Sequence, residues 1–422
     1  MKKNFITGII TGICSAIFLM SILGAAYFYM DEKISNDNDN GVVQENESDV
    51  NAKDNRQDAE EDSMEQITMK LNYLKLLVDS YFLEPVDPKG FADGIYKGFI
   101  SSLEDPYSTY YTAEEYKAVR EGTSGVYYGI GAYVNQNIKT GIISIVRPFE
   151  NGPAHEAGLL PGDIIYKIED EEVTGHDLTD VVSRMKGAEG TTVKIAIIRE
   201  NQAEPIEVTV ERRKVEVPTI ETKMLDNDIG YILITEFDEV TVAQFDKAIS
   251  DLEAAGMKGL IIDVRDNPGG LLDAVVKMLD RILPPGLLVY TKDKYGRRQE
   301  KDATNPDKLT APLAVLINEN SASASEIFAG AIQDYKAGTV IGMTSFGKGI
   351  VQQLIPLSDG TAVKLTISKY YTPKGRDING TGIEPDIEID LSDEMKRAIT
   401  VPIEKDEQLQ KAIEVIMEEI TK

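Results

Sequence analysis

Residues 311–335 read APLAVLINENSASASEIFAGAIQDY and place an apolar strand, a polar turn and a helix directly after one another. The first seven residues are apolar and bounded by turn residues, which is typical of a buried strand. Residues 259–283 repeat this order as strand GLIIDV, turn RDNPGG and helix LLDAVVKMLDRIL. Because such alternation is typical of α/β folds, residues 213–393 are predicted to form an α/β core.

The first polar turn contains three alternating serines, Ser321, Ser323 and Ser325. The sequence from Ser323 to Glu326 fits a capping box, so Ser323 could simply start the helix. A serine at a strand-to-helix turn is also well placed as a nucleophile, because its hydroxyl is exposed. The N–H group of Ala324 would then point to the place where an oxyanion forms.

The second polar turn, DNPGG at residues 266–270, is the natural second donor to such an oxyanion. Glycine lets the backbone approach a substrate closely, so Gly269 or Gly270 can aim an N–H group at the same oxygen. The sequence leaves open which of the two does so.

The chain offers few of the usual catalytic groups. Its two histidines, His155 and His176, both fall in a strand-rich region outside the α/β core, so a Ser-His-Asp triad is not expected. The sequence has no HExxH motif, and Cys14 is its single cysteine, so no metal site and no cofactor are predicted.

A lysine is the remaining candidate for the base, because burial can lower its pKa far enough for it to accept a proton. Lys348 lies in TSFGKGIVQQ between two glycines, with hardly a charged residue nearby in the sequence. Gln352, four residues later, is expected on the same face and could orient a neutral lysine. A lysine between glycines is also typical of an exposed turn.

Residues 122–212 are rich in short strands separated by turns, and the segment GPAHEAGLLPGD at 152–163 looks like the signature of a PDZ domain. PDZ domains bind the C-terminal ends of peptides. The loop expected to bind the terminal carboxylate consists of Tyr128, Gly129, Ile130, Gly131 and Ala132. Small residues there let successive N–H groups converge on a carboxylate, and the next strand can pair with the peptide.

The two ends of the chain differ from its body. Lys2 and Lys3 precede 27 uncharged residues, so residues 1–30 are expected to form a single transmembrane anchor with the body on the extracytoplasmic side of the cell membrane. A cleaved signal peptide is the alternative. Residues 31–66 are predicted to be an acidic disordered linker. The net charge of −27 makes nucleic acid an improbable partner.

Two further segments show helical patterns. Residues 67–121 are predicted to form a small helical domain, in which Thr112 and Glu115 fit a capping box after a break at Asp105-Pro106. Residues 394–422 are predicted to form one or two exposed helices rich in glutamate and lysine.

The motifs GLIIDVRDNPGG, INENSASASEIFAGA, SFGKGIVQQ and KYYTPKGRDINGTGIEPDI occur together with the PDZ-like region and DPYSTYYTAEEY. In this order they resemble the carboxyl-terminal processing peptidases, also called tail-specific proteases, over roughly residues 67–400. The resemblance implies an α+β multidomain protein whose serine protease core is of the crotonase/ClpP-like type. It also implies that the terminal helices support a homodimer, as in family members that dimerise through them.

The resemblance assigns a role to each residue of the site. It implies that Ser323 is the nucleophile, Lys348 the base and Gln352 its partner. The oxyanion donors would be Ala324 and one glycine of the pair 269–270, with the other two serines of the run in supporting positions.

One departure from the family pattern concerns the end of the PDZ-like region. The family often carries RGxxGT there, whereas residues 186–191 read KGAEGT. Lys186 keeps the positive charge but not the planar fork of arginine. The resemblance therefore does not imply that this position couples peptide binding to the active site.

These expectations favour a membrane-anchored serine endopeptidase that trims exported proteins near their C-termini. The alternative is a PDZ-bearing scaffold with an inactive protease fold. The presence of Ser323, Lys348 and Gln352 together argues against the scaffold, because an inactive protein has no need of all three.

Overall fold

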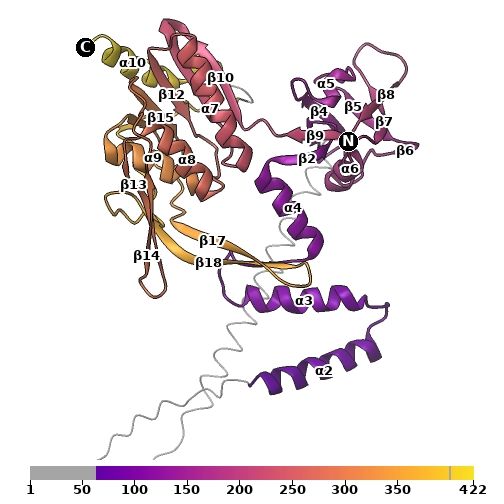
Figure 1. Ribbon diagram of the computed structural model, residues 1–422. Coiled ribbons are helices and arrows are strands. Elements are labelled where there is room, and N and C mark those ends of the chain that lie inside the picture. Colours follow the sequence, from indigo (N-terminus) through magenta and orange to yellow (C-terminus); the bar gives the residue numbers. More distant parts are fainter. Residues whose placement is uncertain (1–62, 399–400) are drawn as a thin grey trace, which may run out of the picture. The chain divides into compact units, whose positions relative to one another are not determined.

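A computed structural model describes residues 63–398 and 401–422 (Figure 1). The expected anchor at 1–30 and most of the expected linker at 31–66 lie outside the described residues. Within the described ranges, no helix is both long and apolar enough to cross a membrane. The chain divides into two compact units, one ending at Pro85 and the other running from Val86 to Lys422.

The described part of the first unit is helix α2 (Met64–Tyr81). Its N-terminus is fixed by a capping box in which Ser63 and Gln66 exchange side-chain-to-backbone hydrogen bonds. The helix therefore begins before residue 67, inside the segment predicted to be linker. None of its residues is buried.

The second unit begins with α3 (Pro88–Ser101), β1 (Thr109–Tyr111) and α4 (Ala113–Ser124). The predicted capping box of α4 is present, since Thr112 N–H donates to Glu115 Oε2 and Glu115 N–H to Thr112 Oγ1. The expectation that residues 67–121 are purely helical is wrong at β1, which pairs with a strand of the α/β core. The segment also ends later than expected, because α4 continues to Ser124.

A β-rich unit follows, with one sheet in the order β3-β4-β5-β7-β8, a short β6 paired to β5, and a separate pair β2-β9. Its elements are β2 (Val126–Gly129), β3 (Ala132–Gln136), β4 (Ile143–Pro148), α5 (Pro153–Glu156), β5 (Ile164–Ile168), β6 (Glu171–Glu172), α6 (Leu178–Met185), β7 (Thr192–Ile198), β8 (Ile206–Glu211) and β9 (Arg213–Glu216). Alternate strand residues and the inner faces of α5 and α6 form one apolar core. The pairing of β9 with β2 carries this unit past residue 212.

The α/β core contains a six-stranded sheet in the order β10-β11-β12-β15-β16-β19. Its strands are β10 (Ile220–Leu225), β11 (Ile229–Ile234), β12 (Gly259–Asp263), β15 (Leu313–Ile317), β16 (Thr339–Gly342) and β19 (Ile387–Glu388), with η1 (Asp226–Asp228) between the first two. Only β10 is antiparallel to its neighbour. Strands β12 and β15 are buried at every position, as expected for parallel strands covered on both faces.

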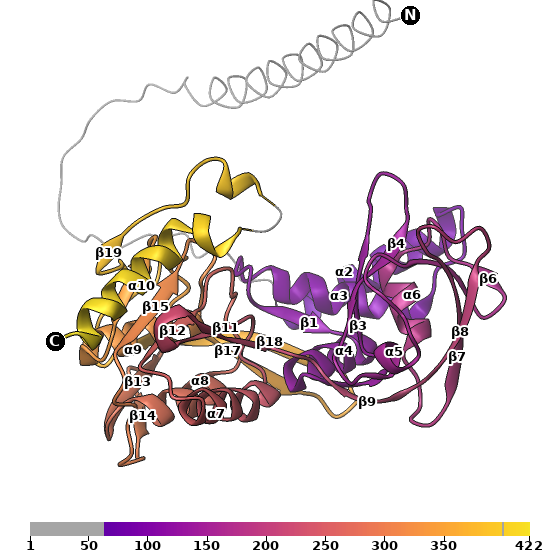
Figure 2. The same ribbon diagram turned by 90° about the horizontal axis from the view of Figure 1, so that it is seen from above.

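Helices cover both faces of this sheet. One face packs against α7 (Glu239–Ala254), α8 (Leu272–Ile282) and α9 (Ala324–Tyr335), and the other packs against α10 (Glu407–Ile420) (Figure 2). The alternation along β12 shows why, because Ile262 belongs to the first apolar cluster and Ile261 to the second. Strand β15 and helix α9 lie where the sequence predicts a strand and a helix around the serine run.

A second sheet has the order β1-β18-β13-β14, with β17 paired to β18. Its strands from the α/β core are β13 (Gly286–Asp293), β14 (Arg298–Ala303), β17 (Ile350–Pro356) and β18 (Ala362–Tyr371). All pairings in this sheet are antiparallel. The loop that carries Lys348 leads directly into β17.

The C-terminal segment consists of η2 (Met395–Arg397), η3 (Ile403–Lys405) and α10. The expectation of exposed helices is wrong for α10, because Leu409, Ala412 and Ile416 are buried against the central sheet. Its glutamates and lysines cover only the outward face, so the charged composition concealed an apolar stripe.

Candidate active site

Ser323 lies at the turn between β15 and α9 and has a strained backbone. Its φ of 55° and ψ of −111° are values that non-glycine residues rarely adopt. Ser323 is partly exposed, whereas Ser321 and Ser325 are fully buried. Ser321 Oγ donates to the carbonyl of Val264 (2.7 Å) and Ser325 Oγ to that of Asn267 (2.9 Å). The two flanking serines therefore brace the neighbouring DNPGG turn and leave Ser323 at the surface.

Glu326 joins the serine turn to the lysine loop. Its side chain is fully buried at the first turn of α9. Oε2 accepts hydrogen bonds from the N–H groups of Ser323 (2.7 Å) and Lys348 (2.9 Å). Oε1 accepts from Ser345 Oγ (2.6 Å) and the N–H of Gly347 (2.7 Å). Four donors therefore converge on one buried carboxylate, which brings together two segments predicted separately from the sequence.

Tyr370 of β18 holds the same two residues by their carbonyl groups. Its hydroxyl lies 3.0 Å from the carbonyl oxygen of Ser323 and also contacts that of Lys348. Burial, together with the nearby carboxylate of Glu326, raises the pKa of this hydroxyl, so it stays protonated and can donate. The N–H and C=O groups of both residues are thus fixed by buried side chains.

Lys348 is half-buried in the loop before β17, and its pKa lies below the ordinary lysine value. Burial is the main cause and the positive charge of Lys364 adds to it, whereas Glu326 and Asp105 act in the opposite direction. The expectation that hardly a charge lies nearby is therefore wrong, because these groups come from distant parts of the sequence. The lysine Nζ lies 4.4 Å from the centre of the Tyr107 ring.

The backbones of Ser323 and Lys348 meet at the Glu326 carboxylate, but no hydrogen bond joins their side chains within the described residues. Catalytic hydrogen bonds are often long or poorly aligned before substrate binds, so the missing bond does not rule out proton transfer.

Gln352 does not contact Lys348 in the way predicted. It lies on β17 opposite Thr366 of β18, and its amide reaches the Thr366 hydroxyl at 3.5 Å. Among the described residues no hydrogen bond links Gln352 to Lys348. Lys348 lies in the loop before β17. The regular spacing of side chains that predicted a shared face with Gln352 does not extend into that loop.

The candidate oxyanion donors lie on the two turns that meet at Ser323. The N–H of Gly269 is already used, because it donates to Asn267 Oδ1 (2.8 Å). Within the described part of the chain, the N–H groups of Gly270 and Ala324 have no hydrogen-bond partner. A Cβ added to Gly269 would lie 2.7 Å from Ala322 O, 2.8 Å from Ser323 Cβ and 2.9 Å from Ala324 N, so only glycine lets the two turns approach this closely. The free N–H groups favour Gly270 over Gly269 as the second donor.

The two histidines lie apart from these residues, as the sequence predicts. His155 belongs to α5 and His176 to the loop before α6, both in the β-rich unit. The nearest acidic group to His176 is Asp180, whose Oδ2 lies 3.9 Å from Nδ1.

The five residues of the expected carboxylate-binding loop connect β2 to β3. Tyr128 and Gly129 end β2, Ala132 starts β3, and Gly131 has a φ of 72°. The carbonyl of Ile130 accepts from Ala154 N–H (2.7 Å). This bond ties the loop to α5, in the GPAHEAGLLPGD segment.

A cavity of about 280 Å³ lies between this loop, α6 and α4. Its wall is mainly apolar and includes Ile130, Ala132 and Val134 from the loop and β3, and Val182 and Met185 from α6. A groove between a strand and a helix next to an N–H-rich loop can hold an extended peptide with its last side chain in the apolar cavity.

Comparison with known proteins agrees with this arrangement. Residues 228–389 match the model of peptidase family S41, residues 145–199 match a PDZ domain, and residues 21–115 match the N-terminal domain of the activating protease CtpB. The carboxy-terminal processing protease CtpA of Bacillus subtilis (strain 168) is 38% identical over 328 residues, which cover 78% of this chain and 70% of that protein. The chain belongs to peptidase family S41.

Two further proteins are similar to this chain. The structure of a photosystem II D1 C-terminal processing protease covers 81% of this chain and 91% of its own, with 28% identity and a TM-score of 0.46. CtpB of Bacillus subtilis (strain 168), another carboxy-terminal processing protease, is 36% identical over 321 residues, or 75% of this chain and 66% of that protein. From the family matches and the likeness to CtpA and CtpB, the S41 peptidase described here is a carboxy-terminal processing serine protease with a PDZ domain, and the inactive-scaffold alternative is not favoured.

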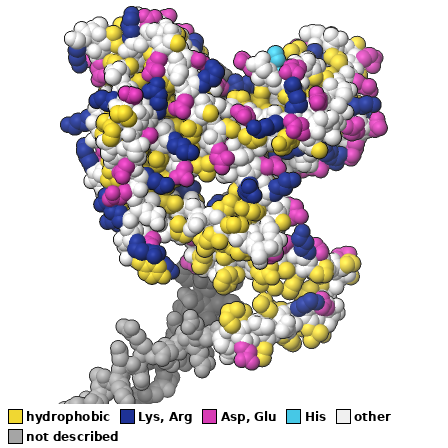
Figure 3. All heavy atoms as spheres, viewed as in Figure 1, with side chains coloured by type: hydrophobic (Ala, Val, Ile, Leu, Met, Phe, Trp, Pro, Cys, Tyr) yellow, Lys and Arg dark blue, Asp and Glu magenta, His cyan; other side chains and the backbone are white. Residues whose placement is uncertain are grey.

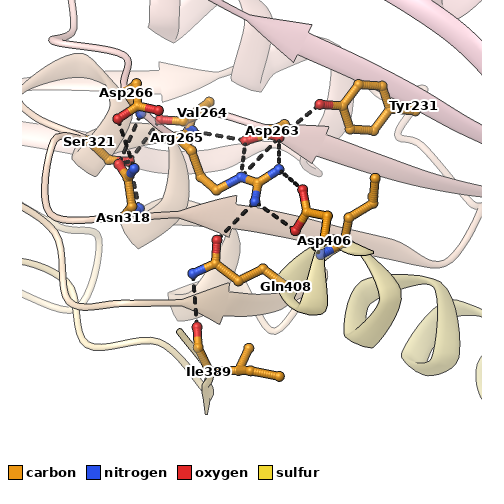
Figure 4. A network of polar contacts seen from close by, with 11 residues as sticks. Tyr231, Asp263, Val264, Arg265, Asp266, Asn318, Ser321, Ile389, Asp406 and Gln408 are labelled. Carbon is orange, nitrogen blue, oxygen red and sulfur yellow. Dashed lines mark hydrogen bonds and ion pairs between the residues drawn. The ribbon is translucent and has the colours of Figure 1, made fainter. Parts of the chain in front are cut away.

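The sequence motifs of this S41 peptidase did not reveal a buried network behind the DNPGG turn (Figure 4). Arg265 donates to Asp263 at the end of β12 and to Asp406 at the start of α10, with shortest distances of 2.6 and 2.8 Å. It also reaches Gln408 Oε1 at 2.9 Å, and Tyr231 donates to Asp263. In the sequence, only the position of Arg265 between an apolar strand and the turn hints at this network. Its partner at 406 is too distant in sequence to be inferred.

Proposed function

We propose that this S41 peptidase cleaves its substrates through an acyl-enzyme on Ser323, with Lys348 as the general base. The observation that carries the proposal is the shared carboxylate of Glu326, which receives the N–H groups of both residues through one oxygen. The lowered pKa of Lys348 supports it, because a neutral amine is needed to accept the serine proton.

In the proposed reaction, Ser323 Oγ attacks the scissile carbonyl carbon while its proton passes to Lys348 Nζ. The N–H groups of Ala324 and Gly270 stabilise the negative oxygen of the tetrahedral intermediate. The protonated lysine then gives its proton to the leaving amine as the peptide bond breaks. Water attacks the resulting ester with the neutral lysine again as base, and this step releases the carboxyl product and restores Ser323.

Gln352 has a weaker role in this proposal. Its contact with Thr366 places it in the sheet beside the lysine loop, so it supports the position of that loop rather than carrying charge. We expect Gln352→Ala to reduce kcat less than either substitution of Ser323 or Lys348.

The test is cleavage of a fluorogenic peptide by purified variants. Ser323→Ala and Lys348→Ala are expected to abolish turnover to a similar extent, because the two residues act as a unit. Lys348→Arg should not restore it, since a guanidinium does not release its proton at working pH. The double variant His155→Ala/His176→Ala is the control and should keep its kcat. If Lys348→Ala retained most of its turnover while the histidine variant lost it, the mechanism would be wrong.

The PDZ domain is proposed to bind substrates that end in a free carboxylate, preferably after an apolar last residue. The loop from Tyr128 to Ala132 would receive the carboxylate, and the apolar cavity beside α6 supports an apolar side chain at the last position. Peptides with the same sequence as free acid and as amide test this proposal, because only the acid should bind tightly.

The substrates are proposed to be exported proteins, cut on the extracytoplasmic side of the cell membrane. The support is the uncharged run behind Lys2 and Lys3, which is long enough to span a bilayer. Fractionation and N-terminal sequencing of the mature protein test the anchor. A soluble chain beginning at Tyr27 would argue for a signal peptide instead.

A homodimer is proposed because apolar side chains are exposed on the N-terminal helices (Figure 3). Those at least half exposed on α2 and just after it are Met64, Met69, Tyr73, Leu76, Tyr81, Phe82 and Leu83, and near α3 they are Phe99 and Leu103. Exposed apolar surface of this kind marks interaction sites in soluble proteins. A monomeric mass at micromolar concentration, unchanged when residues before Pro85 are removed, would contradict the dimer.

A further inference from the structure

The carboxylate-binding end of the PDZ groove contains a side chain of the protein itself. The Tyr127 ring packs against Gly129, where an added Cβ would lie 2.9 Å from Tyr127 Cε2. Burial raises the pKa of the Tyr127 hydroxyl to about 12. Tyr127 lines the same cavity as Ile130 and Ala132, so its ring lies beside the expected carboxylate-binding loop.

A cation lies near the same ring. Lys186 Nζ is 5.1 Å from the centre of the Tyr127 ring, and both residues line the groove cavity. A carboxylate bound at the loop would enter the cavity that the ammonium of Lys186 also lines. Lys186 is thus placed to balance the charge of a peptide C-terminus.

The position of Lys186 is fixed by its backbone. It is the C-cap of α6, and the carbonyl groups just before it accept from Arg212, whose Nη2 lies 2.8 Å from Arg184 O and whose Nε lies 3.3 Å from Met185 O. The next residue, Gly187, donates its N–H to the carbonyl of Tyr128. The end of α6 is therefore held against the carboxylate loop, and only the lysine side chain has freedom to change partner.

That lysine is paired with Glu121 of α4. The distance from Lys186 Nζ to Glu121 Oε2 is 3.1 Å, and the two side chains are 38% and 33% exposed. Glu121 also lines the groove cavity. Glu121, which lies outside the PDZ sheet, is thus paired with the lysine that lines the same cavity as the binding loop.

We propose that Lys186 binds the terminal carboxylate of the peptide and that Glu121 competes with the peptide for it. Binding would exchange the Glu121–Lys186 ion pair for one between the peptide carboxylate and Lys186. Because the peptide must displace Glu121 from Lys186, the competition lowers peptide affinity. A peptide without a free carboxylate cannot replace Glu121 there, so the groove is selective for free C-termini. This inference rests on the proposed binding of free C-termini by the PDZ domain.

The test compares peptide affinities of the full chain carrying Ser323→Ala, which prevents cleavage. A fluorescein-labelled peptide ending in valine is used as free acid and as amide, with binding followed by anisotropy. Glu121→Gln should bind the free acid about two- to fivefold more tightly, the range that an exposed ion pair supplies, with amide affinity unchanged. Lys186→Met should prefer the acid less strongly than the parent, because only the loop N–H groups then bind the carboxylate, and Lys186→Arg should keep the full preference for the acid.

The matched control is Glu156→Gln, which removes a carboxylate paired with Arg213 at 2.7 Å on the same domain but outside the groove lining. It should leave both affinities unchanged, and thermal unfolding should show that each variant is folded. If the parent protein bound acid and amide equally, the proposed peptide function itself would fail. If the parent discriminated but Glu121→Gln gained nothing, or gained equally for acid and amide, or if Lys186→Met discriminated as strongly as the parent, the competition would be disproved.

Discussion

The backbone N–H groups of Ser323 and Lys348 donate to the same oxygen atom, Oε2 of Glu326, at 2.7 and 2.9 Å. A single buried atom therefore sets the separation between the proposed nucleophile and its base. Tyr370 repeats the connection at the carbonyl groups of the same residues. Proton transfer depends steeply on such geometry, so the residues that fix the two loops should matter nearly as much as those that react.

The first prediction concerns Glu326→Gln. The amide keeps the shape of the side chain but can accept through only one of its two terminal atoms, so at least one of the four donors loses its acceptor. Each lost hydrogen bond to a charged group costs about 1.5–3 kcal/mol, and we expect kcat to fall at least about tenfold. Peptide affinity, measured by anisotropy in the Ser323→Ala background, should not change.

Asp334→Asn is the matched control for that substitution. Asp334 is another buried acid on α9, paired with Arg376 at 2.7 Å and distant in sequence from the serine turn. It should lower the unfolding temperature with little effect on kcat of the folded enzyme. Equal losses of kcat in both variants would mean that Glu326 acts only through stability.

The second prediction is the pH dependence of cleavage. The proposed base works in its neutral form, so kcat/KM should rise with pH through the pKa of Lys348, which burial and Lys364 lower. In Lys364→Met the repelling charge is gone, the ammonium of Lys348 is more stable, and the rising limb should move to higher pH. Lys369→Met, which removes an exposed lysine paired with Asp377 on the same strand, should leave the limb in place. A limb that moves to lower pH in Lys364→Met would contradict the assignment of the base.

The sequence predicted the core elements well because buried parallel strands read as continuous apolar runs. The strand, turn and helix around Ser323 followed from that pattern alone. Strand β1 was missed because three residues carry no usable periodicity and its partner, β18, lies some 250 residues later. The burial of α10 was missed because its charged outer face dominates the composition.

The candidate site was predictable only where motifs are local. Ser323 and the glycine turn each follow a strand, so topology brings them to the same edge of the sheet. The charges around Lys348 come from Asp105, Glu326 and Lys364, and no local pattern connects these positions. The contact of Gln352 with Thr366 likewise depends on strand pairing across a hairpin.

The third prediction concerns the packing of Gly269 against the serine turn. Gly269→Ala would place a methyl group 2.7 Å from Ala322 O, 2.8 Å from Ser323 Cβ and 2.9 Å from Ala324 N, so the nucleophile and the proposed donor N–H of Ala324 would have to shift. Loss of one oxyanion contact lowers kcat by about 10²–10³-fold, and we expect a loss of that size. Gly256→Ala is the control, because its φ of 84° carries a similar backbone strain and nothing lies within 4 Å of the added Cβ. Both variants should lose stability, but only the first should lose turnover.

The last prediction concerns the ion pair between Arg265 and Asp406, which connects the loop behind the DNPGG turn to the start of α10. Both side chains are buried, with 13% and 7% exposure. Asp406→Asn removes the negative charge but leaves Asp263 to hold the arginine, so we expect a loss of about 1.5–3 kcal/mol in the free energy of unfolding. The chain has no tryptophan, so urea titration would be followed by tyrosine fluorescence. Asp390→Asn breaks an exposed pair with Lys396 in the same C-terminal segment and should cost less than about 1 kcal/mol. If the two variants unfolded at the same urea concentration, the buried network would not be what fastens α10 to the α/β core.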